Sequence, residues 1–68
     1  MVEPGTYRHF KGGIYEVIGV ATDSETEAEI VVYRSADGRL WTRSRAMFEE
    51  MVDVSGSRVQ RFARLPDA

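Results

Sequence analysis

Short segments rich in β-branched and aromatic residues, separated by glycine or small polar residues, constrain the fold of this chain most strongly. Such side chains favour extended backbone, and glycine between two of these segments permits a tight turn. The sequence therefore predicts a chain made mainly of short strands joined as hairpins. The expected strands cover 6–11, 14–22, 27–34, 39–43, 52–54 and 58–62.

The first hairpin is expected where two glycines, at 12–13, interrupt the segment "TYRHFKGGIYEVIGVA". A two-residue Gly-Gly loop would pair Phe10 with Tyr15, as an aromatic cross-strand pair. A three-residue loop that includes Lys11 would pair Phe10 with Ile14 instead. The sequence leaves these two registers open.

The second hairpin is expected around "SADG". Its last residue, Gly38, suits the left-handed position that follows a type I turn. Because alternate residues of a strand point to the same face, Arg39, Trp41 and Arg43 are expected to lie side by side on one face of the sheet.

One short helix is expected over "SRAMFEEMV", with Ser44 as its N-cap and an apolar stripe that includes Phe48. About five or six short strands and one helix in this length predict a mainly β fold, a small and partly open SH3-like barrel. The expected core consists of Phe10, Ile14, Ile18, Val20, Ile30, Val32, Leu40, Met47, Phe48, Val52, Val54 and Phe62.

The size of the chain limits its organisation. Its 68 residues are expected to form one domain over 6–62, with flexible termini at 1–5 and 63–68. It has no cysteine, which excludes disulfides and thiolate metal sites. No basic segment followed by an apolar run opens the chain, and no apolar segment reaches the length of a membrane helix. We expect a cytoplasmic protein that does not contact membranes.

The charged residues are unevenly distributed. The net charge is −2, which does not favour bulk attraction to nucleic acid, and eight of the nine basic residues are arginine. The segment "DSETEAE" carries four acidic residues and no basic one, whereas "RSADGRLWTRSR" is arginine-rich around the single tryptophan. Arginine binds carboxylates through a planar, bidentate group and stacks on aromatic rings, so the second segment is a candidate recognition surface.

Several segments in order resemble the uncharacterised bacterial family called domain of unknown function 1653. They are "GTYRHFKGGIYEVIGVA", "SETEAEIVVYRS", "LWTR", "MF" and "VQRF". The resemblance covers Gly5 to Phe62 and implies a compact β-barrel, but no activity, cofactor or substrate. Two positions depart from the family pattern, since Ser44 replaces a common proline and Asp23 a common histidine. The matching residues are Tyr7, His9, Lys11, Gly12, Tyr15, Glu25, Glu27, Tyr33, Trp41, Arg43, Phe48, Arg61 and Phe62.

A non-catalytic interaction module is the function that the sequence favours. Small barrels bind extended peptides in aromatic-lined grooves, and arginines recognise acidic groups. The partner is expected to be a protein or peptide, with a second copy of this chain as one candidate. The alternative is binding of single-stranded nucleic acid or nucleotides, by stacking on Trp41 beside the arginines. The expected contact residues are Tyr7, His9, Lys11, Tyr15, Trp41, Arg43 and Arg61.

Catalytic and metal sites are weakly supported. His9 would need an orienting partner, which Glu16 could supply in the Gly-Gly register, yet no nucleophile motif or phosphate loop accompanies it. The acidic residues from Asp23 to Glu29 lack the spacing of a calcium loop, and we expect them to lie in a solvated loop. We therefore expect no catalytic residue, no metal and no cofactor.

Overall fold

The computed structural model describes residues 2–66. Seven strands and one helix follow each other as β1 (Gly5–His9), β2 (Ile14–Thr22), β3 (Glu29–Arg34), β4 (Leu40–Ser44), α1 (Arg45–Phe48), β5 (Met51–Val54), β6 (Ser57–Gln60) and β7 (Phe62–Arg64). Five strands form one antiparallel sheet in the order β4-β3-β2-β1-β7, and β5 pairs with β6 separately. The sheet is partly open, with β4 and β7 as its edges. The predicted mainly β, partly open architecture with one short helix is confirmed.

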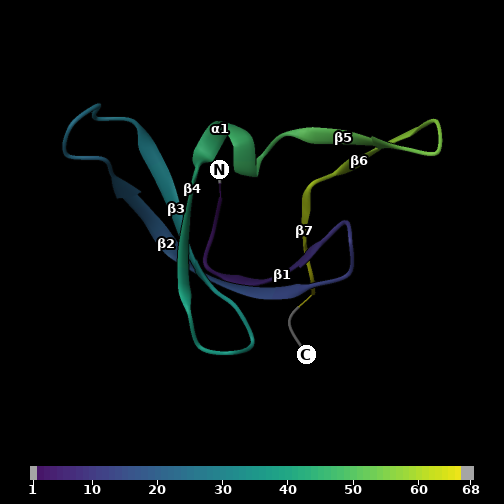
Figure 1. The fold of residues 1–68 in the computed structure, drawn as a ribbon, viewed down its shortest axis with the longest axis horizontal. Coiled ribbons are helices and arrows are strands. Elements are labelled where there is room, and N and C mark those ends of the chain that lie inside the picture. The colour runs from purple at the N-terminus through teal and green to yellow at the C-terminus, as the bar shows by residue number, and fades with distance from the viewer. Residues whose placement is uncertain (1, 67–68) are drawn as a thin grey trace.

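The molecule is elongated, with a longest dimension of 37 Å. The connection between β2 and β3 and the β5–β6 hairpin extend to opposite ends of this axis, and α1 lies between them (Figure 1). The β5–β6 hairpin thus projects away from the five-stranded sheet.

The last expected strand, over 58–62, is divided in two, which raises the number of strands above the five or six expected. The division falls at Arg61, whose N–H donates to the carbonyl of Glu50 (3.1 Å) and whose carbonyl accepts from the N–H of Phe10 (2.9 Å). The backbone of Arg61 therefore joins the end of the helical segment to the first turn. This leaves β6 paired with β5 and β7 paired with β1.

The first hairpin has a register that differs from both expected ones. The N–H of His9 donates to the carbonyl of Gly13, and the N–H of Gly12 donates to the carbonyl of His9, each at 2.7 Å. Only Gly12 of the two glycines has a positive φ, 105°. The loop therefore closes at His9, and Tyr7, not Phe10, pairs with Tyr15. Both registers expected from the sequence are wrong, because the loop extends further back along the chain.

The second hairpin and the helix cap agree with the sequence. Gly38 has a φ of 88°, and its N–H donates to the carbonyl of Ser35 (2.9 Å). The Ser44 hydroxyl accepts from the N–H of Met47 (3.2 Å), as expected of an N-cap. The helix is shorter than expected, since β5 begins at Met51.

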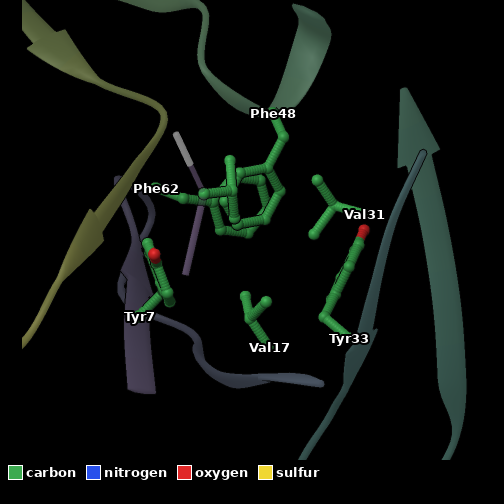
Figure 2. Close-up of a cluster of buried hydrophobic side chains, with 7 residues drawn as sticks. Tyr7, Val17, Val31, Tyr33, Phe48 and Phe62 are labelled. Atoms are coloured by element: carbon green, nitrogen blue, oxygen red, sulfur yellow. The ribbon is translucent and has the colours of Figure 1, made fainter. Parts of the chain in front are cut away.

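The core is small and aromatic. The rings of Phe48 and Phe62 stack with centroids 4.2 Å apart and planes 6° apart. Figure 2 shows this stack at the centre, with Tyr7 and Tyr33 on its two sides. The buried residues are Val2, Tyr7, Val17, Val31, Tyr33, Phe48 and Phe62.

The expected core was largely wrong, because it took the opposite face of the strands. Phe48 and Phe62 are buried as expected, but several of the others are exposed. Tyr7, Tyr33 and Val31 point inward instead, toward the phenylalanine stack. A bulge between Val17 and Gly19 also shifts the pairing of β2 with β3. The expected core residues that are exposed are Ile14, Ile18, Val20, Leu40, Met47 and Val54.

The N-terminal segment contributes to the core. Val2 is buried, and the backbone of Glu3 exchanges two hydrogen bonds with the Tyr7 hydroxyl. At the other end, the N–H of Leu65 donates to the carbonyl of Thr6 (2.8 Å). The structure thus ties residues on both sides of 6–62 to the sheet, and the mobility of the two ends stays a prediction.

Candidate functional site

Three side chains that carry or can acquire positive charge lie close together, and two of them contact the ring of Phe62. His9 comes from the end of β1, Arg43 from β4, and Arg61 from the junction of β6 and β7. The His9 ring centroid lies 4.9 Å from that of Phe62, and the guanidinium carbon of Arg43 lies 5.8 Å from it. We refer to His9, Arg43 and Arg61 as the arginine–histidine cluster. The fold thus brings together residues that are far apart in sequence.

The two arginines of this cluster differ in how their charge is balanced. Arg61 forms an ion pair with Glu50 at 2.5 Å. Arg43 is half-buried and forms no ion pair within residues 2–66. The Nε atoms of both arginines are buried without a hydrogen-bond partner. Because a partly desolvated charge without a counter-ion is unfavourable, Arg43 is the group best prepared to receive an external anion.

His9 is held as an acceptor in this cluster. Its Nδ1 accepts from the N–H of Lys11 (3.2 Å). Burial, together with the positive charges of Arg43, Arg61 and Lys11, lowers the pKa of His9 below its ordinary value. The expected orienting pair with Glu16 is wrong, because Glu16 lies opposite Thr6 in the register.

The other expected contact residues of the first hairpin occupy different environments. Tyr7 is buried in the core, with its hydroxyl donating to the carbonyl of Glu3 (2.9 Å). Tyr15 is half-buried and packs edge-on against Tyr33, with centroids 5.4 Å apart. Lys11 is exposed in the loop after β1. Tyr15 adjoins the arginine–histidine cluster through its ring, 6.4 Å from that of His9 between centroids, and Lys11 adjoins it through the hydrogen bond of its N–H to His9.

Trp41 lies on the same strand as Arg43, two residues away, and is 39% exposed. Its Nε1–H donates to the Ser35 hydroxyl (2.9 Å), and the guanidinium carbon of Arg39 lies 4.5 Å from its ring centroid. Trp41 pairs with Tyr33 and Arg43 with Val31, so both face the concave side of the sheet. The expected row of Arg39, Trp41 and Arg43 on one face is confirmed for Trp41 and Arg43, and the stacking places Arg39 beside Trp41.

The acidic segment after β2 is used in local structure. Asp23 accepts hydrogen bonds from the N–H groups of Glu25 (2.8 Å) and Thr26 (3.1 Å), and these bonds lower its pKa. Glu29 forms an ion pair with Arg45 at 2.5 Å. Residues 2–66 contain no group of three or more His, Cys, Asp or Glu side chains able to hold a metal ion.

An apolar hollow of about 420 Å³ adjoins His9. Phe10, Val54, Val59 and Ala63 supply its apolar walls. The hollow lies between the first turn and the β5–β6 hairpin, and His9 is the member of the cluster that lines it.

A family model described as "Protein of unknown function (DUF1653)" matches residues 5–64. The chain belongs to this family. The crystal structure of a DUF1653 protein from Bordetella bronchiseptica is similar, with a TM-score of 0.88 and 34% sequence identity. The similarity covers 98% of this chain and 91% of that one. No curated protein is significantly similar to this chain. The resemblance read from the motifs is thereby confirmed.

Two side-chain contacts of the candidate site were not predicted from the sequence. Glu50 balances Arg61, and Ser35 holds the indole of Trp41. Neither contact produces a periodic pattern in the sequence, because the two residues that it joins belong to different elements or turns. Within the described part of the chain, no helix is long and apolar enough to span a membrane.

Proposed function

We propose that this protein is a non-catalytic interaction module that binds an acidic segment of a protein partner at the arginine–histidine cluster. The observation that carries the proposal is the half-buried guanidinium of Arg43, which lies over Phe62 and has no carboxylate partner within residues 2–66. A partner carboxylate would supply the missing counter-ion and accept charge-assisted hydrogen bonds.

The surroundings of Arg43 favour a peptide carboxylate. Arg61 and His9 stand beside it. Because Glu50 balances the charge of Arg61 and the lowered pKa of His9 keeps its ring neutral at neutral pH, Arg43 supplies the positive charge that an anion placed there meets. The exposed indole of Trp41 offers apolar contact area to the rest of the segment. Tyr15 adds an amphipathic ring at the same place, as expected of a protein-binding surface.

Single-stranded nucleic acid is the alternative partner, and the exposed Trp41 beside Arg39 favours it. One ring face of Trp41 is covered by that guanidinium, however, and the chain is acidic overall. Both features weaken base stacking and attraction to a phosphate backbone, so we rank this function second.

The test compares an acidic peptide with its neutral counterpart. The probe is the blocked heptapeptide Thr-Glu-Thr-Leu-Thr-Glu-Thr, and in the neutral version glutamine replaces both glutamates. Titration followed by Trp41 fluorescence and calorimetry should show binding of the acidic peptide only. Arg43→Gln should weaken that binding about tenfold or more, since a charge-assisted hydrogen bond is lost.

The matched control is Arg58→Gln, because Arg58 is 72% exposed on the separate β5–β6 sheet. It should leave the affinity within about twofold. Equal binding of the acidic and neutral peptides would overturn the proposal. Tighter binding of oligodeoxythymidylate than of the acidic peptide, falling steeply with salt, would replace it with the nucleic-acid function.

A further inference from the structure

The concave surface ends at an unpaired strand edge. β4 is the last strand of the sheet and pairs only with β3. Within residues 2–66, no backbone hydrogen bond joins residues 40–43 to any segment other than β3. Alternate residues of such an edge leave their N–H and C=O groups available to another strand. The strand order places β4 and β7 at opposite edges of the sheet.

The side chains along this edge alternate in a way that specifies a ligand. Trp41 and Arg43 face the concave side, with Arg39 stacked on Trp41, while Leu40 and Thr42 face the other side. Neighbouring strands place their side chains directly opposite one another on each face. An added strand would therefore present every second side chain to the row of arginine, tryptophan and arginine.

We propose that β4 takes up an extended acidic peptide as an additional strand. Acidic side chains lie opposite Arg39 and Arg43, and an apolar side chain lies opposite Trp41. The ligand class is thus a segment of the form acidic-x-apolar-x-acidic, where x faces Leu40 and Thr42. Main-chain hydrogen bonds supply affinity in this mode, and the alternate side chains supply specificity. The inference rests on the proposed function and adds its binding geometry.

Charge distinguishes β4 from the other free edges. β7 has only three residues, and β1 covers its other side. The β5–β6 hairpin carries Asp53 beside Arg58, at 4.0 Å, so its one arginine already has a carboxylate nearby. Only β4 combines a five-residue edge with an arginine that has no ion pair within residues 2–66.

The experiment uses the full chain and two N-methylated forms of the heptapeptide Thr-Glu-Thr-Leu-Thr-Glu-Thr. One form is methylated at both glutamates, and the other at the two threonines that flank leucine. Because N–H groups of alternate residues point to opposite edges of a strand, only one form blocks bonding to β4. One form should bind about tenfold or more weakly than the unmodified peptide, and the other within about twofold.

The possible outcomes separate the two proposals. If both methylated forms bind as well as the unmodified peptide, or both weaken equally, strand addition at β4 is overturned, while recognition of the acid by Arg43 stands. If the unmodified peptide does not bind, the proposed function fails and this inference with it. An isomeric peptide with adjacent glutamates, Thr-Glu-Glu-Leu-Thr-Thr-Thr, should bind more weakly, and equal binding would contradict the alternating pattern.

Discussion

The guanidinium of Arg43 lies over the ring of Phe62, with 5.8 Å between the guanidinium carbon and the ring centroid. Arg43 belongs to β4 and Phe62 to β7, which are the two edges of the five-stranded sheet. The contact therefore places an unbalanced cation directly above the core, where the sheet is open. Phe62 therefore belongs to the core and also contacts the candidate site.

The phenylalanine stack should dominate stability. Phe48→Ala should lower the free energy of unfolding by about 3–5 kcal/mol, because a nearly fully buried ring is lost from its stack with Phe62. A domain of this size rarely has more stability than that, so the variant should be largely unfolded at 25 °C. Urea denaturation followed by Trp41 fluorescence measures the change. Met47→Ala, on the same helix but 49% exposed, should change it far less, and equal losses would contradict the core.

Two glycines should respond differently to substitution by alanine. Gly38 has a φ of 88°, so Gly38→Ala should cost about 1–2 kcal/mol of backbone strain. Gly19 lies in β2 without a left-handed φ, and a Cβ there would meet no atom within 4 Å. Gly19→Ala should therefore leave stability unchanged or raise it by about 0.4–1 kcal/mol. Thermal melting of the two variants tests the contrast, and destabilisation by both would show that the bulge at Gly19 requires glycine.

The stability of the fold should depend on pH through His9. Burial and the charges of Arg43, Arg61 and Lys11 lower its pKa in the folded state, whereas the unfolded chain keeps a value of about 6.5. The unfolded state therefore binds more protons over the interval below about 6.5. Stability should be complete above that pH and should fall as the pH drops through the interval.

The control for this prediction is His9→Gln, which removes the titrating group. Urea midpoints measured between about pH 5 and 8 should vary less in this variant than in the wild type. The same slope in both proteins would assign the pH dependence to other groups, such as the carboxylates of the acidic segment.

Features that depend on neighbours along the chain were predictable from the sequence. Gly38 closes its turn, and Ser44 caps its helix, because each contact lies within a few residues. The row of Trp41 and Arg43 follows in the same way from the alternation of a single strand. The first hairpin is the exception, since the two glycines allowed more than one loop, and the contact of Phe10 with Arg61 favours the longer one.

The sequence alone determined that short strands, tight turns and one capped turn of helix build this protein, and that it resembles the DUF1653 family. It could not determine which face of the strands is inside, because "EIVVYR" carries apolar side chains on both faces and a shift of one residue exchanges them. Only the tertiary structure decided this, because Val31 and Tyr33 pack in the same buried cluster as the stacked rings of Phe48 and Phe62. The same packing placed Arg43 over Phe62 and matched Arg61 with Glu50, contacts between segments that no local pattern relates.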